Sequence, residues 1–190
     1  SAATGNRVEG NIVGLDATGT VALGNGNSGV FVQEAPGNTV GGVVPAARNT
    51  VSANGGHGVV IAPEGEVLTI GYLITEAETV WLTDDQGRAC AGYVLGYDQE
   101  TGFGLVKPLQ KMDWPMLTLG SAASIEVNDP VVLAGHGGVD QAVSARLLAK
   151  REFAGYWEYV LDEALFTAPA HPNWGGAALL NKRGELCGIG

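Results

Sequence analysis

The sequence is poor in cysteine, in positive charge and in long apolar runs, and each shortage excludes a class of protein. Two cysteines in 190 residues are too few for a disulfide framework or, on their own, for a zinc site. Ten Lys and Arg against twenty Asp and Glu give a net charge of −10, which argues against binding to nucleic acid or anionic lipid. No run approaches the roughly 18–20 apolar residues of a membrane helix. We therefore expect no nucleic-acid partner, no membrane insertion, no metal and no cofactor.

Charged residues make up only 16% of the chain, whereas hydrophobic residues make up 45%. A chain of this length and composition buries a core and forms one large domain or two small ones. Thirty glycines indicate many tight turns and favour β structure over a helical bundle.

The composition changes near residue 57. Residues 1–57 contain twelve of the glycines and seven of the ten asparagines, and Phe31 is their single aromatic residue. All four tryptophans and all five tyrosines follow residue 58. We therefore predict two domains, residues 1–55 and residues 56–190.

Short apolar phrases recur in the first segment between Gly and Asn. GNRVEGN at 5–11, GNTVGG at 37–42 and RNTVSAN at 48–54 share an Asn-x-Val core, and the Gly-Val phrase at 29–32 returns 29 residues later at 58–61. Such repeats predict stacked parallel rungs; the alternative is a glycine-rich run of hairpins. The pattern resembles the right-handed parallel β-helix repeat of bacterial surface and carbohydrate-active proteins. No pair of carboxylates suited to glycoside chemistry accompanies it.

The second segment alternates short apolar runs with turn signals such as Pro63-Glu64-Gly65 and Lys182-Arg183-Gly184. The pattern predicts an all-β sandwich or pair of barrels. We expect strands at 58–62, 66–74, 78–83, 88–96, 103–109, 130–134, 142–150, 156–161, 176–180 and 185–189.

Three phrases of this segment resemble, in order, the HtrA-like serine proteases of the trypsin fold. GHGVVIAPEGEVLTIGYLI at 56–74 is similar to the strands that lead to the catalytic His, and residues 80–108 are similar to the stretch that contains the catalytic Asp. HPNWGGAALLNKRGELCGIG at 171–190 is similar to the nucleophile loop and the strand after it. The resemblance implies a double β-barrel. The family has a further strand after this one, so we expect an incomplete second barrel with Leu186–Ile189 near a free edge.

The catalytic chemistry of that family is not matched by these residues. Tyr72 occupies the His position, Gly102 the Asp position and Trp174 the Ser position. A phenol with a pKa near 10 is no base at neutral pH, glycine orients nothing, and an indole has no nucleophilic atom. Pro172 stands where the family uses a backbone N–H in the oxyanion hole, and proline has none. We therefore expect no catalytic residues, and Tyr72, Gly102 and Trp174 are expected to converge at the cleft between the barrels.

Other candidate nucleophiles and bases are weak in this sequence. His136 and His171 are expected to be solvated loop histidines, and neither follows the strand phrase where the family's base belongs. Cys90 and Cys187 lie in strand phrases and are expected to be small buried hydrophobes.

Aromatic residues gather in the last third of the chain, and two interpretations stay open. Phe153, Tyr156, Trp157, Tyr159 and Trp174 either pack between the barrels or line a cleft that binds peptide. In the second case the candidate binding residues are Trp174, Gly175, Gly176, Tyr156, Trp157 and His171. The acidic neighbours Glu158, Asp162 and Glu163 would then favour a basic or neutral ligand.

These observations favour a non-catalytic serine-protease homologue that serves as a peptide-binding, protein-binding or structural module. Two alternatives stay open: an active HtrA-type serine endopeptidase, and a carbohydrate-associated β-helix surface protein. The resemblances also favour a bacterial periplasmic or extracellular setting and allow a homo-oligomer.

Overall fold

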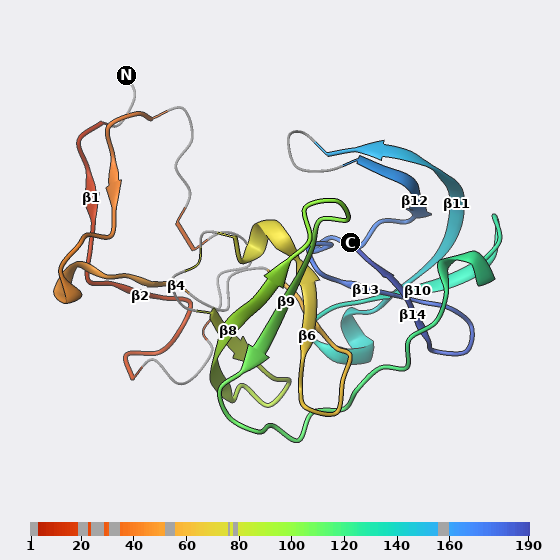
Figure 1. Ribbon diagram of the computed structural model, residues 1–190, viewed down its shortest axis with the longest axis horizontal. Helices are drawn as coiled ribbons and strands as arrows, with labels where there is room; N and C mark the ends of the chain where they lie inside the picture. Colours follow the sequence, from red (N-terminus) through yellow and green to blue (C-terminus); the bar gives the residue numbers. More distant parts are fainter. Residues whose placement is uncertain are drawn as a thin grey trace. The chain divides into compact units, whose positions relative to one another are not determined.

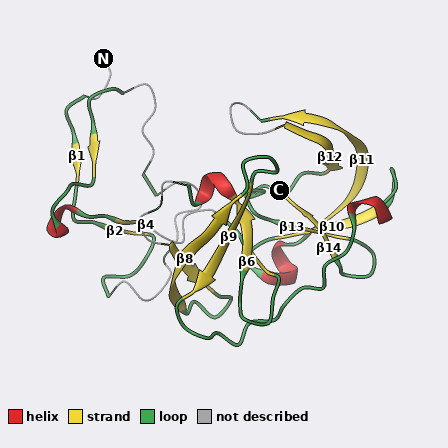
Figure 2. Cartoon of the chain, in the orientation of Figure 1, coloured by secondary structure: helices red, strands yellow, loops and turns green. Residues whose placement is uncertain are grey.

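A computed structural model describes residues 4–18, 23, 29–30, 35–51, 56–75, 77, 80–155 and 160–190. Its regular structure consists of strands and of short 3-10 helices at turns (Figure 2). None of the helices in these ranges is long and apolar enough to cross a membrane. Contacts along the chain divide it into two compact units, residues 1–55 with 81–90 and residues 56–80 with 91–190. The division into two domains at residue 55 stays a prediction.

The first unit contains two short pairs of parallel strands. Strand β1 (Arg7–Val8) pairs with β3 (Thr39–Val40), and β2 (Ile12–Val13) pairs with β4 (Thr50–Val51). The 3-10 helix η1 (Pro45–Ala47) lies between β3 and β4. Parallel pairing of this kind is what the rung prediction requires, and hairpins would have paired antiparallel.

Asparagines hold the register of both pairs. Asn38 Oδ1 accepts hydrogen bonds from the backbone N and the Nδ2 of Asn6, at 2.9 Å each. Asn49 Oδ1 accepts from the same two groups of Asn11, at 3.0 and 3.2 Å. The recurring Asn-x-Val phrases therefore lie on one another, 32 and 38 residues apart. These spacings differ from the 29-residue offset of the Gly-Val phrases. The last two residues of the first Gly-Val phrase, 31 and 32, lie outside the described ranges.

The remaining strands form two antiparallel five-stranded sheets. The first has the order β5-β6-β9-β8-β7 and the second the order β12-β11-β10-β13-β14 (Figure 1). The first sheet consists of β5 (Val59–Val60), β6 (Val67–Ile70), β7 (Val80–Thr83), β8 (Ala89–Tyr97) and β9 (Phe103–Pro108). The second consists of β10 (Pro130–Ala134), β11 (Val143–Ala154), β12 (Val160–Ala168), β13 (Ala178–Leu180) and β14 (Leu186–Ile189).

Strand β14 lies at one edge of the second sheet, where it pairs with β13. On its other side, backbone bonds join Leu186 to Thr118 and Gly120, and Leu119 forms an isolated parallel bridge with Leu186. The expected position of Leu186–Ile189 near an edge is therefore seen, with residues 118–120 covering the start of the strand.

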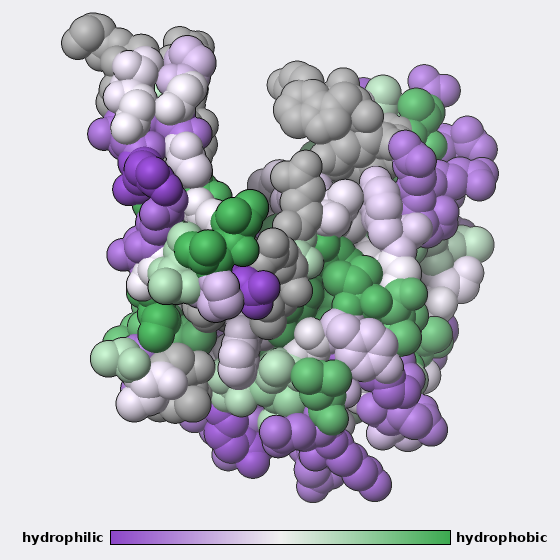
Figure 3. Space-filling view, turned by 60° about the vertical axis from the view of Figure 1, so that its left-hand side comes forward, coloured by the Kyte–Doolittle hydropathy of each residue, from purple (hydrophilic) through white to green (hydrophobic). Residues whose placement is uncertain are grey.

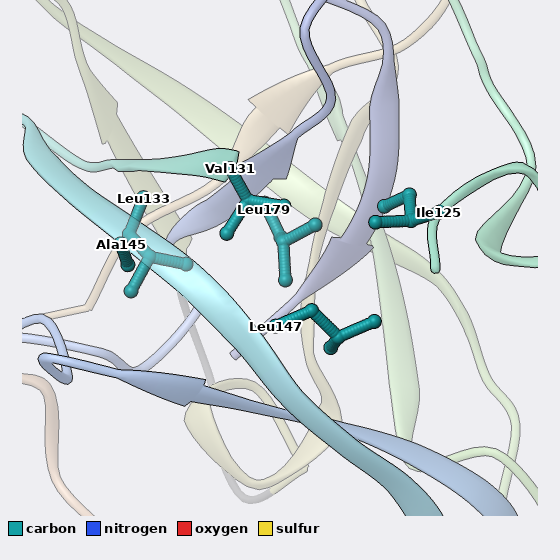
Figure 4. Packing of buried hydrophobic residues seen from close by; sticks show 6 residues of the cluster. All are labelled: Ile125, Val131, Leu133, Ala145, Leu147 and Leu179. Atoms are coloured by element: carbon teal, nitrogen blue, oxygen red, sulfur yellow. The ribbon is translucent and has the colours of Figure 1, made fainter. Parts of the chain in front are cut away.

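Two clusters of buried side chains form the core of the second unit. Figure 4 shows one inside the second sheet, where side chains of β10, β11 and β13 meet Ile125. The other joins the two sheets, because Val59 of β5 packs with Ala178 of β13 and Leu186 of β14. This second cluster anchors the end of β13 that follows the loop at 171–176. Large apolar side chains are also exposed, Tyr72 and Trp174 among them, and Figure 3 shows apolar patches on one face.

Three of the expected strands differ clearly from those observed. The strand expected at 142–150 continues to Ala154 as β11. The strand expected at 66–74 ends at Ile70, where the 3-10 helix η2 (Gly71–Leu73) begins. The strand expected at 156–161 begins at Val160 and continues to Ala168, because β12 pairs along most of the twelve-residue strand β11. Bulges at two places in that pairing shift the alternation of inward and outward side chains, so the periodicity does not reveal the length of the strand.

Candidate functional site

Tyr72 lies on the short helix η2, immediately after β6. Residues 67 and 69–70 are buried, so β6 is fixed in the first sheet and holds η2 at its end. Tyr72 is 42% exposed. Gly71 before it allows the Tyr97 ring to lie against its Cα, because a Cβ atom at this position would overlap that ring. Glycine at 71 therefore brings two tyrosines to one end of the sheet.

Gly102 closes the turn that leads into β9. Its backbone φ is +73°, in the left-handed region that favours glycine, and its N–H donates to the Asp98 carbonyl at 2.8 Å. The Gly102 carbonyl accepts from Gly71 N at 2.7 Å, which joins this turn to η2. Hydrogen bonds from the Thr101 hydroxyl and the Glu100 N–H lower the pKa of Asp98, so this carboxylate stays ionised beside Gly102 at neutral pH.

Trp174 lies in the loop between β12 and β13. The His57 N–H donates to the Gly175 carbonyl at 2.8 Å, and the Ala177 N–H donates to the Trp174 carbonyl at 2.8 Å. Gly176 has φ of +78°, and its N–H donates to the Gly190 carbonyl at 2.7 Å. Backbone bonds thus fix both sides of the loop, while the indole of Trp174 is 55% exposed.

The structure brings Tyr72, Gly102 and Trp174 together. The Tyr72 and Trp174 rings lie edge to face, with centroids 6.4 Å apart and an interplanar angle of 63°. A Cβ atom at Gly175 would lie 2.8 Å from the Tyr72 hydroxyl oxygen, so the phenol extends over the backbone of this loop. The Gly71–Gly102 bond adds the third position. An aromatic pair therefore occupies the point where the three phrases meet.

In the part of the chain that the structure describes, no serine or cysteine at this point is hydrogen-bonded to an imidazole. Nucleophilic catalysis of the serine type needs a hydroxyl bonded to an imidazole. The nearby hydroxyl of Thr69 is buried and donates instead to the His57 carbonyl, at 2.6 Å. Among the described residues, no group of three or more His, Cys, Asp and Glu is arranged to hold a metal ion.

The backbone N–H groups just before Trp174 are absent or already bonded. Pro172 has no N–H to donate. The N–H of Asn173 points back to His171 Nδ1, at 3.1 Å. Two consecutive backbone positions before Trp174 thus offer no donor to a substrate carbonyl.

The expectation of solvated loop histidines is wrong for His171. Its ring is buried and lies between the Asn173 backbone and the Gln141 carbonyl oxygen, which is 3.1 Å from Nε2. His136 is exposed, as expected. His57 is half-buried, and its pKa is lowered, mainly by burial and then by the proximity of His171; the Asn173 carbonyl raises it in part and His136 lowers it further. Gly-His-Gly occurs at 56–58 and again at 135–137, which was the available sequence signal for two members of this cluster.

The remaining aromatic and cysteine predictions have mixed outcomes. Phe153 packs edge to face against Phe166 of β12, with centroids 6.1 Å apart, and the Arg151 guanidinium lies 4.4 Å from the centre of the same ring. Tyr156, Trp157 and Tyr159 lie outside the described residues. Cys90 is buried and Cys187 half-buried, in agreement with the prediction.

Sequence comparison finds a trypsin-like peptidase domain over residues 56–189. Similar proteins include the putative serine protease HhoA of Synechocystis, 29% identical over 152 residues that make up 77% of this chain and 38% of HhoA. A probable periplasmic DegP-like endoprotease of Chlamydia trachomatis is 21% identical over 76% of this chain and 29% of its own length. The chain spans about a third of the length of these relatives.

Solved structures show the same fold. The HtrA-type protease AlgW with a decapeptide superposes with a TM-score of 0.62 and 22% identity, over 86% of this chain and 49% of AlgW. AlgW with a tripeptide superposes with a TM-score of 0.59 and 25% identity, over 70% of this chain and 45% of AlgW. The two five-stranded sheets are thus those of a trypsin-like double β-barrel. From its sequence and its fold, the chain belongs to the family of trypsin-like peptidase domains and is a homologue of the HtrA and DegP serine proteases.

Proposed function

We propose that this chain is a non-catalytic member of its family that binds peptide or protein segments at the Tyr72–Trp174 pair. The observation that carries the proposal is the edge-to-face contact of these two exposed rings. The resemblance of the surrounding phrases to active relatives aligns the two residues with the base and nucleophile positions of the family. Exposed aromatic pairs provide a large apolar contact area at low cost in side-chain entropy, and such residues dominate binding energy at interfaces.

The charge near the pair favours a basic or neutral ligand. Asp98 is ionised and lies in the turn that is bonded to Gly71 through Gly102. The chain as a whole also has a net charge of −10. A ligand with lysine or arginine would gain Coulomb energy, and an acidic ligand would be repelled.

A matched set of fluorescent decapeptides tests the binding. The peptides share one apolar sequence and carry two lysines, two glutamines or two glutamates. We expect the lysine peptide to bind best and the glutamate peptide worst, measured by anisotropy. Tyr72→Ala and Trp174→Ala should each weaken binding about tenfold, the cost of about 1.4 kcal/mol that a central aromatic contact carries. Tyr93→Ala removes a comparably exposed tyrosine of β8 and serves as the control.

A fluorophosphonate probe tests the catalytic half of the proposal. The probe forms an adduct with an activated serine, and we expect none with this chain because the resemblance aligns Trp174 with the nucleophile. Stoichiometric labelling would restore the active-endopeptidase alternative. The proposed site would be refuted if the lysine and glutamate peptides bound with equal affinity. It would also be refuted if neither aromatic substitution changed the affinity.

For residues 1–55 we propose a pair of parallel β-helix rungs. The two parallel strand pairs and the two asparagine contacts support it. Stacked Asn side chains satisfy their own amides and the backbone N–H of the neighbouring rung, which keeps short strands in register. This segment then has a structural role beside the protease-like unit.

A further inference from the structure

The three histidines of the chain meet beneath the Trp174 loop. His57 precedes β5, His136 follows β10, and His171 follows β12. The rings of His57 and His171 lie edge to face with centroids 5.9 Å apart. The backbone N–H of His136 donates to His57 Nδ1 at 3.1 Å. Three loops that are distant in sequence are therefore joined around one imidazole.

The backbone of His57 holds the Trp174 loop directly. Its N–H donates to the Gly175 carbonyl at 2.8 Å. Its carbonyl accepts from the buried Thr69 hydroxyl and lies against the Cα of Gly176, where a Cβ atom would overlap it. A movement of His57 therefore moves the two residues that follow Trp174.

The tautomer of His57 follows from its partner. Because the His136 N–H is a donor, Nδ1 accepts and carries no proton, so the neutral ring holds its hydrogen at Nε2. Protonation of Nδ1 places a hydrogen opposite the His136 N–H and breaks this bond. The new positive charge would lie on a half-buried ring whose Nε2 is shielded from solvent.

The groups that face His57 offer little compensation for that charge. The titratable residues that act on it are His171 and His136, which both disfavour a proton, and the Asn173 carbonyl is the one group that favours it. Asp140 belongs to the 3-10 helix η4 (Gly138–Gln141) beside this loop, but no carboxylate of the described residues is among the groups that shift the pKa of His57.

His171 holds the residue before Trp174 from the other side. Its buried ring lies with Nε2 3.1 Å from the Gln141 carbonyl oxygen and Nδ1 2.8 Å from the Asn173 carbonyl oxygen, and the Asn173 N–H lies 3.1 Å from Nδ1. The ring beside His57 is therefore bonded to the backbone of the residue immediately before Trp174.

We propose that His57, His136 and His171 form a proton-sensitive clasp that holds the Trp174 loop in its binding conformation at neutral pH and releases it on acidification. The consequence for ligand binding rests on the proposed function, whereas the release of the loop does not. A histidine with a lowered pKa stabilises the fold above its unfolded-state pKa of about 6.5, and this contribution is lost as the pH falls toward the folded-state pKa.

Histidine NMR tests the clasp without any ligand. Because the chain has three histidines, labelling of the ring Cε1 atoms yields three signals between pH 4.5 and 8. We expect one signal to titrate at a lower pH than a free histidine, and the Trp174 indole N–H and the His136 amide to shift with the same midpoint. A Trp174 signal that does not change over this range, or that follows a different midpoint, would overturn the proposal.

His57→Asn is the matched variant, because the Asn Oδ1 atom can replace Nδ1 as acceptor for the His136 N–H but does not titrate. It should abolish the shift of the Trp174 signal. His136→Gln removes an exposed ring and keeps the backbone donor, so it should retain the shift with a slightly higher midpoint. A shift that persists in a folded His57→Asn protein contradicts the clasp.

If this variant does not fold, hydrogen exchange of the His136 amide in the unaltered chain tests the clasp instead. The exchange rate should rise below the midpoint by more than the intrinsic pH effect. Unchanged protection of this amide would refute the proposal.

Peptide binding separates this inference from the proposed function. With one proton linked to binding, affinity for the lysine peptide should fall about tenfold for each pH unit below the midpoint. A Trp174 shift without peptide binding at any pH would support the clasp and refute the binding site. Binding at pH 7.5 that persists unchanged below the midpoint would support the site and refute the clasp.

Discussion

Glycine at position 176 is required for two independent reasons. Its φ of +78° is one that side chains rarely adopt, and a Cβ atom there would overlap the backbone carbonyl of His57. Gly184 has a similar φ of +76° but has nothing within 4 Å of a Cβ atom. The two positions therefore separate the cost of backbone strain from the cost of a clash.

We expect Gly176→Ala to lower the free energy of unfolding by about 3 kcal/mol or more, because a backbone atom cannot move aside as a flexible side chain does. Gly184→Ala should cost about 1 kcal/mol, the strain of the left-handed region alone. Urea unfolding of both variants measures the difference. Equal costs would show that the loop readily moves away from His57.

Paired asparagines stabilise the parallel strands β1 to β4 of the first unit, because each of these strands is only two residues long. Asn49 accepts from Asn11 and also donates through Nδ2 to the Val8 carbonyl, at 2.6 Å. Two-residue parallel strands form few backbone bonds, so side-chain bonds carry much of the register.

Asn49→Ala should therefore destabilise the first unit by about 1–2 kcal/mol, the usual cost of leaving partly buried polar groups unpaired. The amide of Asn11 should lose protection in hydrogen exchange. Asn49→Asp keeps the acceptor for Asn11 and loses the bond to Val8, so it should retain more of that protection. An Asn11 amide that exchanges equally in all three proteins would argue against the asparagine contact.

The two units of the chain are stabilised by different kinds of interaction. The second contains both clusters of buried apolar side chains, whereas the first contains the two-stranded parallel pairs. Units with separate cores commonly unfold separately, and the one with less buried apolar surface opens first.

We expect two transitions in urea, with the first unit unfolding at the lower concentration. Leu147 is fully buried, and Leu147→Ala should lower the second transition by about 2–5 kcal/mol. Leu148→Ala, at the 53% exposed neighbour, should change it by less than about 0.5 kcal/mol. Asn49→Ala should move the first transition alone. A single transition displaced by both Leu147→Ala and Asn49→Ala would show that the units unfold as one.

Local patterns in the sequence were sufficient to predict most of the strands. Alternating apolar residues and glycine turns located β8, β9 and β10 to within about one residue, because side chains along much of these strands are buried at a period of two. The prediction that Tyr72, Gly102 and Trp174 stand at the protease positions also came from the sequence, since the identity of a residue and its place in a phrase require no coordinates. The Asn-x-Val phrases predicted parallel rungs in the first segment but did not indicate which strands pair.

Contacts between distant segments could not be predicted in this way. Tyr72 packs on Trp174 because β6 and β13 belong to two sheets that share the buried cluster of Val59, Ala178 and Leu186. His57, His136 and His171 meet for the same reason, although each occupies an ordinary glycine-rich or proline-rich loop in the sequence. Burial and hydrogen bonding set the pKa of a histidine. Both depend on neighbours that folding brings from other parts of the chain.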